Sequence, residues 1–277
     1  MRDRSAFGAD PLGRANYASG SGNLEARAAL WSYAVRPADA PPARPDWFLD
    51  LVAWDGVRRA ADVGCGSGRY VGPLRARADH VVAVDLSPAM LAEVAGSGAA
   101  DGLVNADVGR LPLREGCLDA ALAAWMLYHA ADPAEACAEL RRVLTADGVL
   151  IAVTNAAAHT AELDEVYGEA AGALLGAARP RPALPANGFT LDEAADHLSR
   201  SFASVTAHPR RVRLRVPSPG PIVAYLGSLR TYVDVALQPD GATFDDLVPF
   251  VEAACRRRID AVGAVEVTGL PVALVCR

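Results

Sequence analysis

The spacing of apolar and polar residues changes repeatedly along the middle of the chain. Short runs rich in Val and Ala, without polar alternation, recur at about 59–64, 80–86, 102–106, 118–126 and 148–154. Such runs are typical of strands in a parallel sheet that is covered on both faces. Between them, helical periodicity recurs at about 69–78, 88–96 and 133–145. The alternation predicts a doubly wound, Rossmann-like α/β fold.

Helical and extended segments flank this core. An amphipathic segment at 23–35 comes before a proline-dense connection, and 46–54 predicts a helix that leads into the first strand. After the fifth strand, helical patterns lie at 159–175, 190–202, 221–237 and 244–262, and extended segments lie at 203–216 and 264–276. We therefore expect an N-terminal cap or lid over 1–45, and a main domain over 46–277 with a helical lid insertion at about 217–262.

Composition narrows the possible functions. The chain has 277 residues, of which 52% are hydrophobic, so it can bury a substantial core and is not expected to be disordered. All 27 basic residues are arginine, which excludes a Schiff-base lysine and the lysine of a phosphate-binding P-loop. The net charge of −6 gives no support for a nucleic acid as partner.

The cysteines and the apolar segments bear on location. The five cysteines form no CxxC pair and no spacing typical of zinc ligands, so we expect reduced, mostly buried thiols and no metal site. No apolar run reaches the length of about 18 residues that a membrane helix needs. We therefore expect a cytoplasmic protein that does not enter a membrane.

A glycine-rich segment, ADVGCGSG at 61–68, carries the strongest functional signal. It ends the first predicted strand and opens a helix, and Gly64, Gly66 and Gly68 would allow a sharp turn close to a ligand. The dinucleotide fingerprint GxGxxG would need Gly or Ala at 69, where this chain has Arg69. The pattern is instead an acid, Asp62, followed by GxGxG.

Two further acids stand at the predicted ends of the next strands. Asp85 comes 21 residues after Gly64, where a carboxylate can accept the hydroxyls of a ribose, and Asp107 follows the third strand, within reach of an adenine amino group. Without a phosphate-binding lysine, three acids in this order suit a positively charged nucleoside better than a phosphate.

These motifs, together with VVAVDLSPAML, NADVGRLPL and the run from Leu118 to Val153, resemble class I S-adenosylmethionine-dependent methyltransferases. The similarity covers about 55–155 and is to the broad branch that includes the ubiquinone and menaquinone methyltransferases. It implies a seven-stranded, mostly parallel sheet whose last strand is antiparallel. The segments 203–216 and 264–276 can supply the two C-terminal strands.

The resemblance also implies which residues hold the cofactor S-adenosylmethionine, which would leave as S-adenosylhomocysteine. Asp62 would hold the methionine amino group through the loop, Asp85 the ribose hydroxyls, and Asp107 the adenine edge. The full set of expected cofactor-binding residues is Asp62, Gly64, Cys65, Gly66, Gly68, Asp85, Leu86, Met90, Asp107, Val108, Ala123 and Ala124.

His129 follows the fourth predicted strand, beside the expected methyl group. Its ordinary pKa of about 6.5 suits a general base, although packing or loop ordering is the alternative interpretation. Aromatic and apolar side chains from three regions are candidates for the acceptor pocket, and helix packing would explain them equally well. These candidates are Tyr17, Trp125, Met126, Tyr128 and Tyr225.

We therefore expect a methyltransferase for a small organic acceptor, monomeric or homodimeric, with no nucleic-acid or membrane partner. An aromatic or polyketide-like specialised metabolite is the favoured acceptor, and oxygen is the favoured atom, with carbon and nitrogen left open. Two alternatives remain: a tRNA or rRNA methyltransferase, and a protein that binds S-adenosylmethionine without transferring its methyl group.

Overall fold

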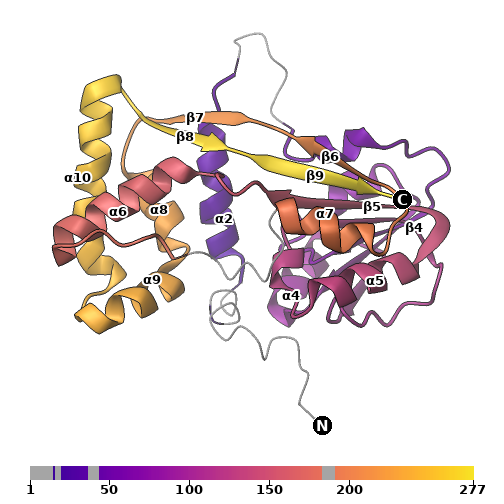
Figure 1. Cartoon of the computed structure of the whole chain (residues 1–277). Helices are drawn as coiled ribbons and strands as arrows, with labels where there is room; N and C mark the ends of the chain where they lie inside the picture. The colour runs from indigo at the N-terminus through magenta and orange to yellow at the C-terminus, as the bar shows by residue number, and fades with distance from the viewer. Residues whose placement is uncertain (1–14, 16–19, 37–43, 183–190) are drawn as a thin grey trace.

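A computed structural model describes residues 15, 20–36, 44–182 and 191–277, and it contains the predicted sheet (Figure 1). Seven strands are ordered β3-β2-β1-β4-β5-β9-β6, and β9 runs antiparallel to both of its neighbours. The remaining neighbours among β1 to β5 are parallel. Their bounds are β1 Arg59–Val63, β2 His80–Asp85, β3 Gly102–Asn105, β4 Leu118–Ala124, β5 Leu144–Asn155, β6 Val205–Pro209 and β9 Pro271–Cys276. The predicted fold class is confirmed.

Helices cover both faces of this sheet. One face carries α5 (Pro133–Val143) and α7 (Leu191–Ser199), and the other carries α3 (Val71–Arg75) and α4 (Pro88–Ser97). Helices α4 and α5 begin where the sequence predicts, at Pro88 and Pro133, and the Asp132 side chain accepts hydrogen bonds from two backbone N–H groups of α5. Because both faces are buried, the strands need no polar alternation.

A helical lobe lies beside the sheet and has a hydrophobic core of its own. Figure 1 shows α2 (Gly22–Ala29) between this lobe and the sheet. The elements of the lobe are α6 Ala161–Leu175, α8 Gly220–Gly227, α9 Arg230–Leu237, α10 Phe244–Val262, β7 Val212–Val216 and β8 Val265–Gly269. Its core contains Leu30 together with residues of α6, α8 and α10, so parts of the chain from before and after the sheet fold together.

Three C-terminal segments that the sequence predicts as single elements are each divided into two in the structure. The extended segments 203–216 and 264–276 each form two strands: β6 and β9 join the main sheet, whereas β7 and β8 form a separate two-stranded sheet. At Gly269, the last residue of β8, an added Cβ would clash with the Trp31 ring, so η2 packs directly on this strand end. The predicted helix 221–237 is broken between α8 and α9, where the Ser228 hydroxyl donates to the Tyr225 carbonyl.

Several N-terminal and central boundaries also differ. The segment 46–54 forms a 3-10 helix, η3 (Trp47–Leu51), and α2 continues as the 3-10 helix η2 (Leu30–Tyr33), which leaves Val35 exposed. The predicted helix 69–78 shortens to α3, and β5 begins at Leu144, directly after α5. The predicted strand 118–126 stops at Ala124 because Trp125 has a positive φ of 54°.

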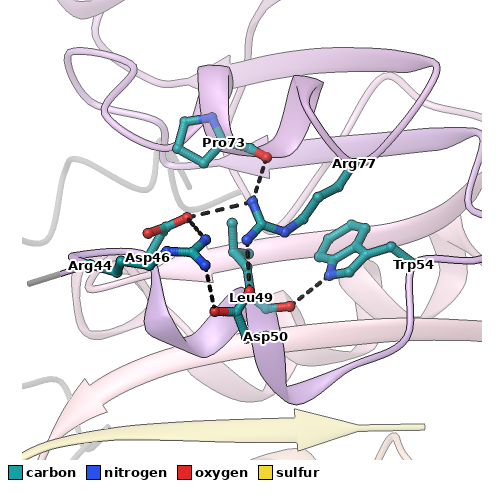
Figure 2. Close-up of polar contacts among 7 residues, drawn as sticks. All are labelled: Arg44, Asp46, Leu49, Asp50, Trp54, Pro73 and Arg77. Carbon is teal, nitrogen blue, oxygen red and sulfur yellow. Dashed lines mark hydrogen bonds and ion pairs between the residues drawn. The ribbon is translucent and has the colours of Figure 1, made fainter. Parts of the chain in front are cut away.

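An ion-pair network fixes η3 against α3 (Figure 2). The Arg77 guanidinium donates to the Pro73 carbonyl at 2.9 Å and to Asp50 at 2.8 Å, and it lies 3.5 Å from Asp46. Arg44 bonds the same two acids at 3.0 Å. The Trp54 indole donates to the Leu49 carbonyl at 2.6 Å, which closes the turn. This network places Phe48, which is fully buried, against the sheet.

We expect Asp46→Asn to destabilise the fold by about 1 to 2 kcal/mol at pH 7, because the side chain is 10% exposed and pairs with two arginines. Burial opposes ionisation of Asp46, but the hydrogen bond from Arg44 and the charges of Arg44 and Arg77 outweigh it, so the pKa of Asp46 is lowered. The contribution of Asp46 is therefore present at neutral pH and is lost as the pH falls through that lowered pKa. Urea denaturation of both proteins at pH 7 and in acid measures the difference.

Asp79→Asn is the matched control, because Asp79 faces Arg58 at 3.5 Å with both side chains at least 65% exposed. Its expected effect is about 0 to 0.5 kcal/mol. Equal losses in the two variants would contradict the proposed contribution of the Asp46 network.

Candidate functional site

The glycine loop joins β1 to the next helical turn and is held by β2. The N–H groups of Gly64 and Cys65 both donate to the Val84 carbonyl, at 2.8 and 3.0 Å. Gly66 donates its N–H to the Asp85 carboxylate at 2.8 Å. Backbone hydrogen bonds therefore fix the loop at the carboxyl edge of the sheet, where open α/β sheets bind their ligands.

The loop glycines are required by close contacts as well as by backbone angles. Gly64 has φ of 68°, and an added Cβ would lie 2.5 Å from the Met126 Cβ. An added Cβ on Gly68 would lie 2.9 Å from Val94 of α4, and one on Gly66 would lie 3.2 Å from Leu24 of α2. The loop is thus enclosed by the end of β4, by α4 and by α2.

Asp62 is the most unusual group at this edge. Its side chain is 1% exposed, and within the described part of the chain no donor reaches its buried Oδ2 atom. Burial, followed by the negative charge of Asp85, raises the pKa of Asp62 to about 7. A buried carboxylate without a donor is unfavourable, so this atom is suited to a cationic or N–H-bearing ligand.

Asp85 ends β2 and accepts two backbone hydrogen bonds, from Gly66 to Oδ2 and from Ser87 to Oδ1, each at 2.8 Å. Burial raises its pKa despite these bonds. Each carboxylate oxygen keeps a further lone pair for a hydroxyl of a ligand. The carboxylate is therefore oriented by the loop that it helps to hold.

The sequence analysis missed Asn105. This residue ends β3, and its amide donates to the carbonyls of Asp85 and Leu86, at 3.0 and 2.9 Å, which supports the turn after β2. Its position at the end of the third predicted strand, next to the strand that ends at Asp85, could have indicated this role. Asp107 lies two residues further on and accepts from the Gly109 N–H at 2.8 Å.

The end of β4 is strained and aromatic. Trp125 adopts a positive φ, donates its indole N–H to Asn155 of β5 at 3.1 Å, and packs edge-on against Phe48 with ring centroids 5.8 Å apart. This turn directs Met126 onto Gly64. Tyr128 and His129 follow in a 3-10 turn, with their ring centroids 4.6 Å apart.

The other predicted site residues lie in different parts of the chain. Cys65, Met90 and Val108 are buried, and Ala123 and Ala124 pair with β5 inside the sheet. Tyr225 lies in α8 of the helical lobe, and Tyr17 is outside the described residues. The five cysteines are free, and four of them are buried, as expected, whereas Cys117 is partly buried. No described helix has the length and apolar character of a membrane span.

Comparisons with known proteins agree with this geometry. Residues 61–152, about a third of the chain, match the family described as a methyltransferase domain. A malonyl-[acyl-carrier protein] O-methyltransferase of Serratia marcescens is 29% identical over 149 residues, which are 52% of this chain and 58% of that protein. An uncharacterized methyltransferase of Mycobacterium bovis is 33% identical over 133 residues, 48% of this chain and 53% of that protein. The chain thus spans little more than half the length of these relatives.

Solved structures share the fold over most of the chain. A putative type II methyltransferase of Anaeromyxobacter dehalogenans has a TM-score of 0.57 at 24% identity, covering 87% of this chain and 98% of its own. A putative methyltransferase from an antibiotic biosynthesis pathway of Anabaena variabilis has a TM-score of 0.59 at 16% identity, covering 84% and 95%. The chain therefore has the Rossmann-like fold of class I methyltransferases.

We predict that Gly64→Ala destabilises the protein more than Gly98→Ala does. Both glycines have similar positive φ, 68° and 64°, but nothing lies within 4 Å of an added Cβ at Gly98. Gly98→Ala should cost about 1 kcal/mol from the backbone alone. Gly64→Ala should cost about 1 to 3 kcal/mol more, because Met126 must move. Chemical denaturation measures both, and equal costs would show that the contact with Met126 is unimportant.

Proposed function

We propose that the chain is an S-adenosylmethionine-dependent methyltransferase that acts on a small organic acceptor. The observation that carries this proposal is the buried Oδ2 of Asp62, which lacks a donor beside a glycine loop held by Asp85. The cofactor has an ammonium group and a ribose, which suit these two carboxylates. A phosphate would instead meet two acids and no lysine.

The chain's own groups then have distinct roles. Asp62 would bind the ammonium of the methionine moiety, and Asp85 would accept the ribose hydroxyls while it holds the loop. Asp107 and Val108 would contact the adenine at the next strand end. When bound, the cofactor supplies a sulfonium methyl group that is already electrophilic, so the protein mainly aligns the acceptor and excludes water.

His129 is our proposed general base. It lies in the turn after β4, next to Met126, and its ring contacts Tyr128. A hydroxyl acceptor would lose its proton to this imidazole as the methyl group is transferred. Tyr128 and Trp125 would line the acceptor side of the same turn.

Relatives support an oxygen acceptor without defining it. One similar protein is named a malonyl-[acyl-carrier protein] O-methyltransferase, and another is described as a putative methyltransferase from an antibiotic biosynthesis pathway. We propose O-methylation of an aromatic or polyketide-like specialised metabolite, by a monomer or homodimer. The ubiquinone and menaquinone methyltransferase branch remains the one whose motifs this chain resembles.

Calorimetric titration tests the cofactor assignment. The wild type should bind S-adenosylmethionine and S-adenosylhomocysteine with micromolar affinity and should not bind NAD. Asp85→Ala and Asp62→Asn should each weaken binding at least tenfold, a loss of about 1.4 kcal/mol or more. Asp79→Asn removes the same charge at the amino end of β2 and should bind normally. Wild-type binding of NAD, or of none of the three, would refute the assignment.

The affinity should also depend on pH. Because the pKa of Asp62 is raised to about 7, the carboxyl must lose a proton before it binds an ammonium. Affinity for S-adenosylhomocysteine should therefore rise by up to tenfold per pH unit below pH 7 and level off above about pH 8. Titrations in two buffers with different ionisation enthalpies should show proton release below pH 7. A flat profile between pH 5.5 and 8.5 would contradict the role of Asp62.

A further inference from the structure

A second polar cluster lies at the end of β5, outside the proposed cofactor contacts. His159 stands in the turn between β5 and α6, with its ring centroid 5.5 Å from that of Trp31 in η2. Since β5 is parallel to β4, this turn lies at the same sheet edge as Trp125 and Met126. The hydrogen bond from Trp125 to Asn155 joins the two strand ends directly.

The imidazole of His159 is held in one neutral form. Its Nδ1 accepts the Leu270 N–H at 3.0 Å, so the proton lies on Nε2. Burial, and next the positive charge of Arg181, lower the pKa of His159 to about 4. No hydrogen bond to Nε2 forms within the described residues. His159 is therefore a neutral donor at physiological pH and not a second base.

Arg181 brings a positive charge to the same place. Its side chain is 14% exposed, and its Nε donates to Asp164 at 2.5 Å. Nη2 lies 3.4 Å from the Thr160 hydroxyl. A guanidinium has five N–H donors, so these two partners leave donors for a ligand. Asp164 is 51% exposed, so water screens its charge.

We propose that Trp31, His159 and Arg181 form the acceptor-binding site and that the acceptor carries a carboxylate on a flat, apolar body. This proposal rests on the methyltransferase function proposed above, because it places the acceptor beside the cofactor edge. The carboxylate accepts hydrogen bonds from Arg181 and from His159 Nε2–H, and the indole of Trp31 packs on the apolar body. The three groups come from η2, the β5–α6 turn and the segment after α6.

Calorimetry with 2-naphthoate, and with 2-naphthamide as its uncharged analogue, tests the proposal on protein saturated with S-adenosylhomocysteine. Wild-type protein should bind naphthoate at least tenfold more tightly than naphthamide. The Trp31 indole N–H signal, identified by its absence in Trp31→Phe, should shift in NMR spectra when naphthoate binds.

The variants separate ligand binding from folding. Arg181→Gln should weaken naphthoate binding at least tenfold and leave naphthamide binding unchanged. Arg179→Gln is the control, because Arg179 lies in the same segment but pairs with Asp240 on the surface, where it is 50% exposed. Asp164→Asn should strengthen naphthoate binding severalfold, because it leaves the Arg181 charge unpaired. If Arg181→Gln does not fold, the stronger naphthoate binding expected for Asp164→Asn still tests the role of Arg181.

The outcomes keep the two proposals apart. If S-adenosylhomocysteine does not bind the wild type, the proposed function fails. If it binds but naphthoate does not, or if naphthoate and naphthamide bind equally, the carboxylate site is refuted. Equal losses for Arg181→Gln and Arg179→Gln, or no gain for Asp164→Asn, would refute the role of Arg181.

Discussion

The carboxylate of Asp62 has almost no contact with water, and its Oδ2 has no donor in the described part of the chain. Such a group costs free energy in the ligand-free protein, and Asp85 nearby increases that cost. A ligand with an ammonium group would remove the cost and would bind more tightly because of it. The fold thus holds an unfavourable group in place at the edge where a ligand can pair with it.

Neighbouring elements maintain this arrangement through contacts that leave little freedom. Hydrogen bonds to Val84 and Asp85 fix the glycine loop, and Met126 packs on Gly64. Met126 is directed there by the positive φ of Trp125, which Phe48 and Asn155 hold. Phe48 in turn depends on the ion pairs between η3 and α3 shown in Figure 2. Contacts between residues far apart in the sequence therefore determine the shape of the glycine loop.

Local patterns predicted the sheet and the acids at its strand ends because buried parallel strands and helix caps depend on neighbouring residues. The sequence did not indicate that Trp125 would leave β4, since positive φ is unusual for such a residue and arises from tertiary packing. The close packing of Trp31 on Gly269 was missed for the same reason, because Trp31 lies near the other end of the chain. Asn105 and Arg181 act through partners that no sequence spacing reveals.

A crystal structure of the complex with S-adenosylhomocysteine would show directly whether Asp62 binds the ligand. We expect the amino nitrogen of the ligand to lie within hydrogen-bond distance of Asp62 Oδ2, and the ribose hydroxyls to bond to the Asp85 carboxylate. A complex in which Asp62 stays without a partner, with the amino group bound elsewhere, would contradict this expectation.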